Sequence, residues 1–174
     1  MDSGLMVTKV NGNSTSTFGG DVDVTGNVIT DAPTFSAYLA TTTSSGTPAN
    51  GTRTKVPFDT ELWDSHSDYD NSTNYRYTPS VAGYYQINCG VIITGTSKAV
   101  VNIYIYKNGS EYNLGLGLRY ASSSNEKLSM SNLVYCNGST DYLEVYALQQ
   151  GATNATLFSS EYSTFFNGFL ARAV

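Results

Sequence analysis

Apolar and polar residues alternate along several short stretches of the chain, which is the period of a half-buried β-strand. The alternation is clearest at residues 85–93, and it recurs at 101–105, 128–136 and 142–148. Asn-Gly pairs follow two of these stretches, at Asn108-Gly109 and Asn137-Gly138, and such pairs are typical of tight hairpin turns. No stretch repeats apolar residues at helical spacing for more than two turns. The pattern predicts an all-β domain, in which 128–136 and 142–148 form one strand pair.

The first 31 residues differ from the rest of the chain. Their segment FGGDVDVTGNVIT places a few valines among Gly, Asp, Asn and Thr, which is too sparse for a core of its own. The segment is either a leader without structure or a strand that buries its valines only against copies of itself. Pro33 marks the boundary, and a strand with Phe35, Ala37 and Leu39 on one face follows it. We therefore expect an N-terminal segment, residues 1–31, and one domain, residues 32–174.

The amino-acid composition argues against several classes of function. Charged residues make up only 13% of the 174 residues, Tyr contributes 14, and the net charge is −5. A chain of this size can bury roughly 70% of its unfolded surface, so a core needs neither metal nor disulfide. The acidic balance and the lack of Lys/Arg runs argue against nucleic acid and against anionic membranes. No stretch is long and apolar enough to span a bilayer, and we expect no signal peptide in MDSGLMVTKV.

Candidate chemistry is sparse. The only histidine, His66, lies in WDSHSDYD, where neighbouring Ser and Asp residues favour a turn over a catalytic triad, so we expect no enzyme. Asp64, Asp68 and Asp70 lack the Gly and terminal Glu of a calcium loop, and no Cys/His cluster suggests zinc. We expect neither a metal nor a cofactor. Cys89 and Cys136 are interpreted as two buried thiols, with a disulfide left open.

Six Asn-x-Ser/Thr sites would suggest glycosylation in a secreted protein. We instead interpret three of them, at Asn50, Asn108 and Asn137, as turns, because a Gly follows each.

Several sequence motifs resemble those of the globular head domain of the complement C1q and tumour necrosis factor families, and they occur in the same order along the chain. The central match spaces aromatic residues around an acidic residue and a glycine, and shorter matches are PTFSAYL, IYKNG, FSSEY and FNGFL. The residues that carry the resemblance are Phe35, Phe58, Asp64, Tyr69, Tyr77, Gly83, Tyr85, Asn108, Gly109, Phe166, Gly168 and Phe169. The turn before Tyr77 is one residue longer than the usual pattern, and the collagen stalk of the C1q family is absent. The resemblance covers residues 33–174 and implies a jelly-roll sandwich that assembles as a homotrimer.

The stretch 142–148 is apolar in both phases, with Tyr142, Tyr146 and Leu148 opposite the inward residues. Either these side chains cover the sheet with their hydroxyls in water, or a neighbouring subunit buries them. The resemblance implies that this strand, the strand from Tyr84 and the last strand share the sheet of the threefold contact. Tyr84, Tyr142, Tyr146 and Leu148 are the predicted trimer-interface residues.

Function is predicted from two resemblances together. GGDVDVTGNV resembles shaft segments of bacteriophage fibres. We expect a trimeric virion protein, a fibre or knob, that binds other virion proteins through its N-terminus and a host glycan or surface protein through its head. Trp63, Tyr75 and Tyr120 are the candidate ligand-binding residues, because aromatic rings among Asn, Ser and Thr suit sugars. The alternative is a non-viral C1q-like binding module, bacterial or secreted and lectin-like. The expected location is the virion, or the extracellular space in the alternative.

Overall fold

The computed structural model describes residues 31–41, 48–115, 117, 125–152 and 155–174. Apart from Asp31, these residues belong to the compact unit Ala32–Val174, and the expected shaft segment therefore lies outside the described residues. The described residues form these eleven strands: β1 (Thr34–Tyr38), β2 (Thr54–Lys55), β3 (Thr60–Asp64), β4 (Tyr69–Asp70), β5 (Arg76–Tyr77), β6 (Ala82–Ile93), β7 (Val100–Lys107), β8 (Ser110–Leu114), β9 (Glu126–Asn137), β10 (Leu143–Gln150) and β11 (Phe165–Ala173). Within these ranges no helix is long and apolar enough to cross a membrane.

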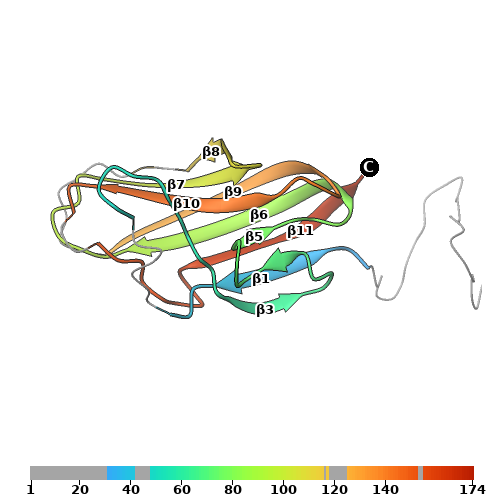
Figure 1. Ribbon diagram of the computed structural model, residues 1–174, viewed down its shortest axis with the longest axis horizontal. Coiled ribbons are helices and arrows are strands. Elements are labelled where there is room, and N and C mark those ends of the chain that lie inside the picture. Colours follow the sequence, from blue (N-terminus) through green and yellow to red (C-terminus); the bar gives the residue numbers. More distant parts are fainter. Residues whose placement is uncertain (1–30, 42–47, 116, 118–124, 153–154) are drawn as a thin grey trace, which may run out of the picture. The chain divides into compact units, whose positions relative to one another are not determined.

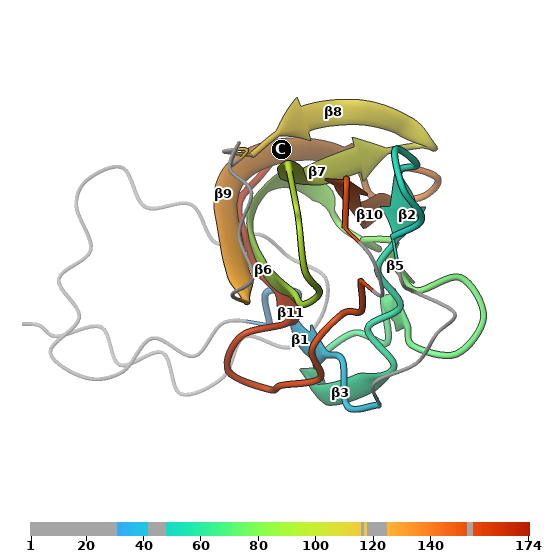
Figure 2. The same ribbon diagram turned by 90° about the vertical axis from the view of Figure 1, so that its left-hand side faces the viewer.

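The strands form two antiparallel sheets that face each other (Figure 2). The first sheet has the order β3–β1–β11–β6–β9, and the second has the order β4–β5–β10–β7–β8, with β2 also paired to β10. The long strands β6, β9 and β11 run side by side in the first sheet (Figure 1). The result is the predicted jelly-roll sandwich, with the core between the sheets.

Two predictions of strand pairing were wrong. Strand β9 pairs with β6 along its whole length, from Ala82↔Asn137 to Ile93↔Glu126, and β10 pairs with β7. The turn after Asn137 therefore crosses from one sheet to the other and does not close a hairpin. For the same reason β10 does not share a sheet with β6 and β11.

The alternation predicted from the sequence is confirmed in the core. Inward residues of β6, β7 and β10 are fully or almost fully buried: Tyr85, Ile87, Cys89, Val91, Ile93, Val101, Ile103, Ile105, Leu143, Val145 and Ala147. Phe35, Ala37 and Leu39 lie in the same core, as expected for β1 and the residue that follows it. Each fully buried side chain of this size contributes roughly 1.5–3 kcal/mol, so this core dominates the stability of the fold.

The aromatic residues of the family-like motif meet at one end of the core. The ring of Phe35 stacks on Tyr77 at 3.9 Å between centroids and on Tyr69 at 5.4 Å. Phe166 meets Phe35 edge-on at 4.9 Å, and Phe58 lies 5.8 Å from Phe166. Such pairs contribute about 0.5–1.5 kcal/mol beyond their buried area. These spaced aromatics are packing residues that join β1, β4, β5 and β11.

The Asn-Gly turns are confirmed where the structure describes them. Asn108 and Gly109 adopt positive φ angles of 53° and 75° between β7 and β8, as a two-residue hairpin turn requires. Gly138 has a φ of 71° and follows Asn137, whose side-chain carbonyl accepts hydrogen bonds from the backbone of residues 139–141. The amide of Asn108 in turn donates to Asp141 at 2.8 Å, which ties the two turns together.

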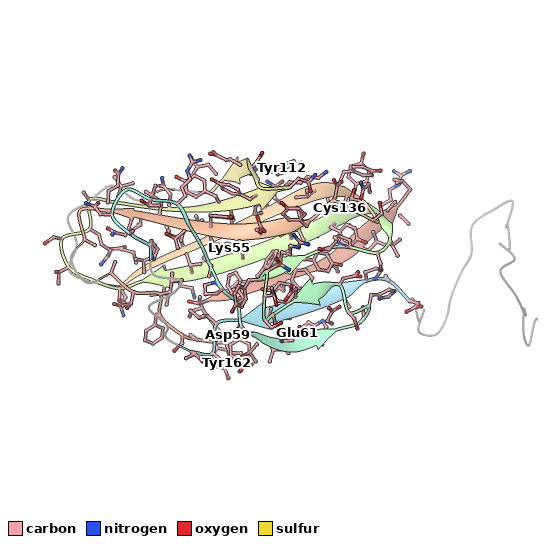
Figure 3. All side chains as sticks on the ribbon, in the orientation of Figure 1. Lys55, Asp59, Glu61, Tyr112, Cys136 and Tyr162 are labelled. Carbon is pink, nitrogen blue, oxygen red and sulfur yellow. The ribbon has the colours of Figure 1, made fainter. Side chains whose placement is uncertain are left out.

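Cys89 and Cys136 are two free, buried thiols on the neighbouring strands β6 and β9, as interpreted from the sequence. Figure 3 labels Cys136. Burial raises the pKa of the Cys136 thiol to about 12 and also raises the pKa of Cys89. A thiol with a raised pKa is a poor nucleophile at neutral pH, so both residues act as small core side chains.

Candidate functional site

The outward side of the first sheet carries an unusual set of side chains over β6, β9 and β11. Outward residues face each other across the strands, because residues opposite in register point to the same side of a sheet. We define the aromatic–amide face as these eight residues: Tyr84, Gln86, Asn88, Ser131, Leu133, Tyr135, Asn167 and Phe169. None of the eight is charged, and charges border the face only at its apolar end, where Arg172 is opposite Tyr84 in register and the Lys107 ammonium lies 5.5 Å from the Tyr135 ring centroid. An outward sheet face in water normally mixes charged and polar residues, so this composition indicates a contact surface.

One end of the aromatic–amide face is apolar and exposed. Leu133, Phe169, Tyr84 and Tyr135 retain 50%, 48%, 41% and 40% of their accessible surface. The rings of Tyr84 and Tyr135 lie 5.5 Å apart between centroids. A hollow of about 300 Å³ is lined by Tyr84, Leu133, Ala171 and Arg172. These side chains form one continuous patch with a depression that a side chain of another molecule can fill.

The middle of the face is an amide row, a chain of hydrogen bonds that crosses three strands. Gln86 donates from Nε2 to Ser131 Oγ at 2.7 Å, and Ser131 donates to Asn88 Oδ1 at 2.8 Å. Asn88 donates from Nδ2 to Asn167 Oδ1 at 3.1 Å. Gln86 also lies between Leu133 and Phe169 in register, so the row borders the apolar end directly. We use the name amide row for Gln86, Ser131, Asn88 and Asn167.

The chain enters the domain beside this face. Thr34, the first residue of β1, is opposite Phe169 in register, and the Pro33 carbonyl accepts a hydrogen bond from Leu170 N at 2.9 Å. The first strand of the head therefore begins next to the exposed apolar end.

The outward side of the second sheet holds three of the predicted interface residues, and other parts of the same chain cover them. The Tyr146 ring stacks on Tyr106 at 4.0 Å, and the Arg76 guanidinium lies 4.4 Å above the Tyr142 ring. Leu148 is only 7% exposed. Burial raises the pKa of the Tyr146 hydroxyl, with Glu144 as the next cause. Of the four predicted interface residues, only Tyr84 lies on the aromatic–amide face.

Charges on this second face are paired within the chain. Arg53 lies 4.4 Å above the Tyr104 ring and forms an ion pair with Glu111 at 2.6 Å. Lys55, which is labelled in Figure 3, pairs with the buried Glu144 and donates to the Asn74 carbonyl at 3.0 Å. Arg53 and Lys55 lie in and beside β2, and their acidic partners lie on β8 and β10, so these charges are paired within one chain. The structure thus favours intrachain cover for Tyr142 and Tyr146.

The predicted ligand-binding residues do not gather in one place. Trp63 lies on the edge strand β3, is 52% exposed, and donates from Nε1 to Thr34 Oγ1 at 3.3 Å. Tyr75 lies in the turn between β4 and β5 of the second sheet, with a positive φ of 49°. Tyr120 lies outside the described residues. Of the described pair, Trp63 has the ring surface available for a ligand.

The acidic stretch around His66 forms turns. Asp64 accepts hydrogen bonds from the backbone of His66 and Tyr69, and Asp68 accepts from Ser80. The Asp70 carboxylate accepts from the backbone of residues 72–74, and these hydrogen bonds hold its pKa well below its usual range. No group of three or more His, Cys, Asp or Glu side chains among the described residues could hold a metal ion. The carboxylates are turn acceptors, which explains the acidic spacing.

Sequence reasoning missed most of the aromatic–amide face. Residues 133–136 read Leu-Val-Tyr-Cys and are apolar in both phases, which is the signal that singled out 142–148. That signal at Leu133 and Tyr135 could have been found. The amide row has no local signal, because Gln86 and Ser131 are 45 positions apart and Asn88 and Asn167 are 79 apart.

Comparisons with known proteins identify the fold. No protein-family model matches the sequence, and no curated protein matches it. Among solved structures, murine APRIL at pH 5.0 aligns with a TM-score of 0.60 and 12% identity, over 80% of this chain and 98% of APRIL. The globular domain of zebrafish complement 1qA aligns with a TM-score of 0.58 and 16% identity, over 82% of this chain and 99% of that domain.

The fold is that of the TNF and C1q head domains. The PRD1 vertex protein P5 has it too, with a TM-score of 0.56, 18% identity, and coverage of 80% of this chain and 97% of P5. The TNF/C1q-like fold predicted from the sequence motifs is therefore confirmed. These likenesses concern the fold alone, and the function is argued from the surface.

Proposed function

We propose that this chain is the homotrimeric head of a virion fibre or knob, and that the head attaches the particle to its host surface. The observation that carries the proposal is the uncharged aromatic–amide face, which is exposed in the single chain. The trimer is further supported by the likeness to TNF and C1q head domains. A chain with a net charge of −5 repels its own copies, and contact through an uncharged face minimises that repulsion.

The exposed apolar end can supply the association energy. Leu133, Phe169, Tyr84 and Tyr135 are each about half exposed, so completing their burial contributes about 1 kcal/mol per side chain. Over three copies the sum is on the order of 12 kcal/mol, against an association cost of at least several kcal/mol. We leave Tyr142, Tyr146 and Leu148 out of this contact, because their own chain already covers them.

The location of the chain entrance supports a fibre. Thr34 lies opposite Phe169, so contact through the aromatic–amide face brings the three copies of Thr34 to one end of the head, and residues 1–31 precede each of them in the chain. There the valines of residues 1–31 can be buried against the same segments of the other copies, and the segment can join other virion proteins. The likeness to the PRD1 vertex protein P5 supports a virion location.

Attachment is proposed through the exposed edge residue Trp63, which lies beside the chain entrance and donates from Nε1 to Thr34 Oγ1 at 3.3 Å. Its ring can stack on a sugar or on an apolar protein side chain. A trimer presents three such sites, so weak single contacts become strong attachment through multivalency.

Two measurements test the proposal. Sedimentation equilibrium of the purified chain should give three times the 18.7 kDa chain mass at micromolar concentration. Fluorescent protein should bind selected glycans on an array, or whole cells in a panel of bacteria, and Trp63→Ala should weaken that binding without changing the mass. A monomer at all accessible concentrations contradicts the trimer. A trimer that binds no glycan and no cell contradicts the attachment role.

A non-viral C1q-like binding module is the second candidate, favoured by the likeness to zebrafish complement 1qA. At two of the possible glycosylation sites of this chain, the asparagine side chain already stabilises a turn. Asn108 donates from its amide to Asp141, and Asn137 donates to Thr140 at 2.8 Å, so a glycan on either nitrogen would break a turn. Expression through a eukaryotic secretory pathway separates the candidates: the virion proposal predicts that Asn108 and Asn137 stay unmodified and that a glycan at either one lowers stability.

A further inference from the structure

The amide row is an open chain of hydrogen bonds with unlike ends. Its first member, Gln86, donates from Nε2, but its Oε1 accepts no hydrogen bond from any described residue. Its last member, Asn167, accepts at Oδ1, but its Nδ2 donates to no described residue. One end of the row therefore offers an unused acceptor, and the other offers an unused donor.

The unused donor and acceptor matter because apolar side chains surround the amide row. Leu133 and Phe169 flank Gln86 on its two neighbouring strands, and Phe165 lies opposite Gly90, two register pairs beyond Asn88 and on the same side of the sheet. If an apolar surface covers the face, the unused amide groups lose their water. Leaving a buried amide without a partner is costly, so whatever covers this face must supply one donor and one acceptor.

A rotationally symmetric trimer supplies both. In a closed ring of identical chains the contacts are head-to-tail, so one patch of each copy meets a different patch of the next. A donor end at β11 and an acceptor end at β6 and β9 fit such a contact. Asn167 of one copy can then face Gln86 of the next, so every unused group in the ring finds a partner.

We propose that the amide row is the element that selects the threefold register: Asn167 Nδ2 of each copy donates to Gln86 Oε1 of the next copy. The inference rests on the proposed trimer and deepens it by naming the polar contact. Apolar side chains supply attraction without direction, and sliding by one residue pair keeps much of their contact. Polar groups within an apolar contact penalise every register that leaves them unpaired, as single polar residues do in coiled coils.

The experiment uses two single variants that each damage one end of the row. Asn167→Asp removes the donor and presents a carboxylate to the Gln86 carbonyl of the neighbour. Gln86→Lys removes the acceptor and presents an ammonium group to the Asn167 amide. Each variant alone should raise the concentration needed for half-assembly at least tenfold, as measured by sedimentation. Far-UV circular dichroism and thermal melts should show a folded head in both, because both side chains lie on the outward face.

Mixing the two variants supplies the decisive readout. A copy with the Asn167→Asp change and a copy with the Gln86→Lys change should form an ion pair across their contact, so mixed trimers should exceed the statistical proportion. Native mass spectrometry with an affinity tag on one variant measures this proportion. A statistical mixture, or single variants that assemble as tightly as the wild type, overturns the proposal while the trimer stands. A wild-type monomer overturns both the trimer and the register proposal.

Discussion

Replacing Leu133 by aspartate tests the proposed contact most directly. Leu133 lies on β9 at the exposed apolar end, lines the hollow beside Tyr84, and is half exposed in the single chain. Its inward neighbours on β9, Val134 and Cys136, carry the core contacts of that strand. The substitution therefore changes the outward surface and leaves the core intact.

The expected effect follows from the burial that is lost. Completing the burial of a half-exposed leucine contributes about 1 kcal/mol, or about 3 kcal/mol over three copies. Each aspartate would in addition lose water without gaining a partner, at a cost of about 1–3 kcal/mol or more. Together these contributions amount to about 6 kcal/mol or more per trimer, which is roughly four powers of ten in the assembly constant. Leu133→Asp should be a monomer at concentrations where the wild type is a trimer.

A matched control comes from the second sheet. Leu114 on β8 is also 50% exposed, so Leu114→Asp introduces the same charge at the same exposure. Sedimentation velocity should give the trimer mass for Leu114→Asp and the chain mass for Leu133→Asp. The double variant Tyr142→Ser with Tyr146→Ser should remain trimeric as well. Thermal melts of diluted samples check that all three remain folded.

Two results would refute the reasoning. A trimeric Leu133→Asp protein would show that the aromatic–amide face is not the contact. Dissociation of the Tyr142/Tyr146 double variant together with an intact Leu133→Asp trimer would assign the contact to the second sheet. In that case, the Arg76 and Tyr106 contacts would be insufficient cover for the tyrosines.

Three further predictions concern the head itself. The buried Tyr77 hydroxyl has no hydrogen-bond partner among the described residues, so Tyr77→Phe should leave the urea midpoint of unfolding unchanged or raise it. Tyr69→Phe is the control: it loses the 3.0 Å hydrogen bond from the Tyr69 hydroxyl to the Phe58 carbonyl and should lower the free energy of unfolding by about 1 kcal/mol. Hydrogen bonds, led by that from Asn108, lower the pKa of Asp141. The stabilisation by Asp141 is therefore fully present above the unfolded-state pKa of about 4 and is lost as the pH falls through the lowered folded-state pKa. Asp141→Asn should cost about 2 kcal/mol at pH 7 and less at pH 3, and an equal cost at both would contradict this. Cys89 and Cys136 should resist iodoacetamide in the native protein and react once it is unfolded in urea; rapid native labelling would contradict their burial.

The sequence predicted the faces of the strands well, because alternation reports burial directly. Residues 85–93 and 101–105 point their apolar side chains inward as expected. The alternation of apolar and polar residues does not indicate which strands pair with each other. The five residues after Asn137 could close a hairpin or cross between sheets, and the choice depends on the long pairing of β9 with β6, whose partners lie far apart in sequence.

Apolar residues in both phases of a strand were a correct but incomplete signal. On β10 the second phase, at Tyr142 and Tyr146, is covered by Arg76 and Tyr106 from distant segments of the same chain. On β9 the Lys107 ammonium lies 5.5 Å from the Tyr135 ring, but Tyr135 stays 40% exposed and Leu133 stays 50% exposed. The sequence cannot separate these cases, because the covering side chains become neighbours only in the folded sheet.

The two outward faces differ most in how their polar groups are satisfied. On the second sheet, the charges of Arg53 and Lys55 find Glu111 and Glu144 within the chain, so the hydrogen bonding of that face is closed. On the first sheet, the amide row runs across the strands and stops with one acceptor and one donor unused. A face with closed hydrogen bonding gains little from a polar partner, whereas an open one gains directional contacts. Apolar exposure therefore supports the proposed association through the aromatic–amide face, and its unlike ends support a head-to-tail contact between copies.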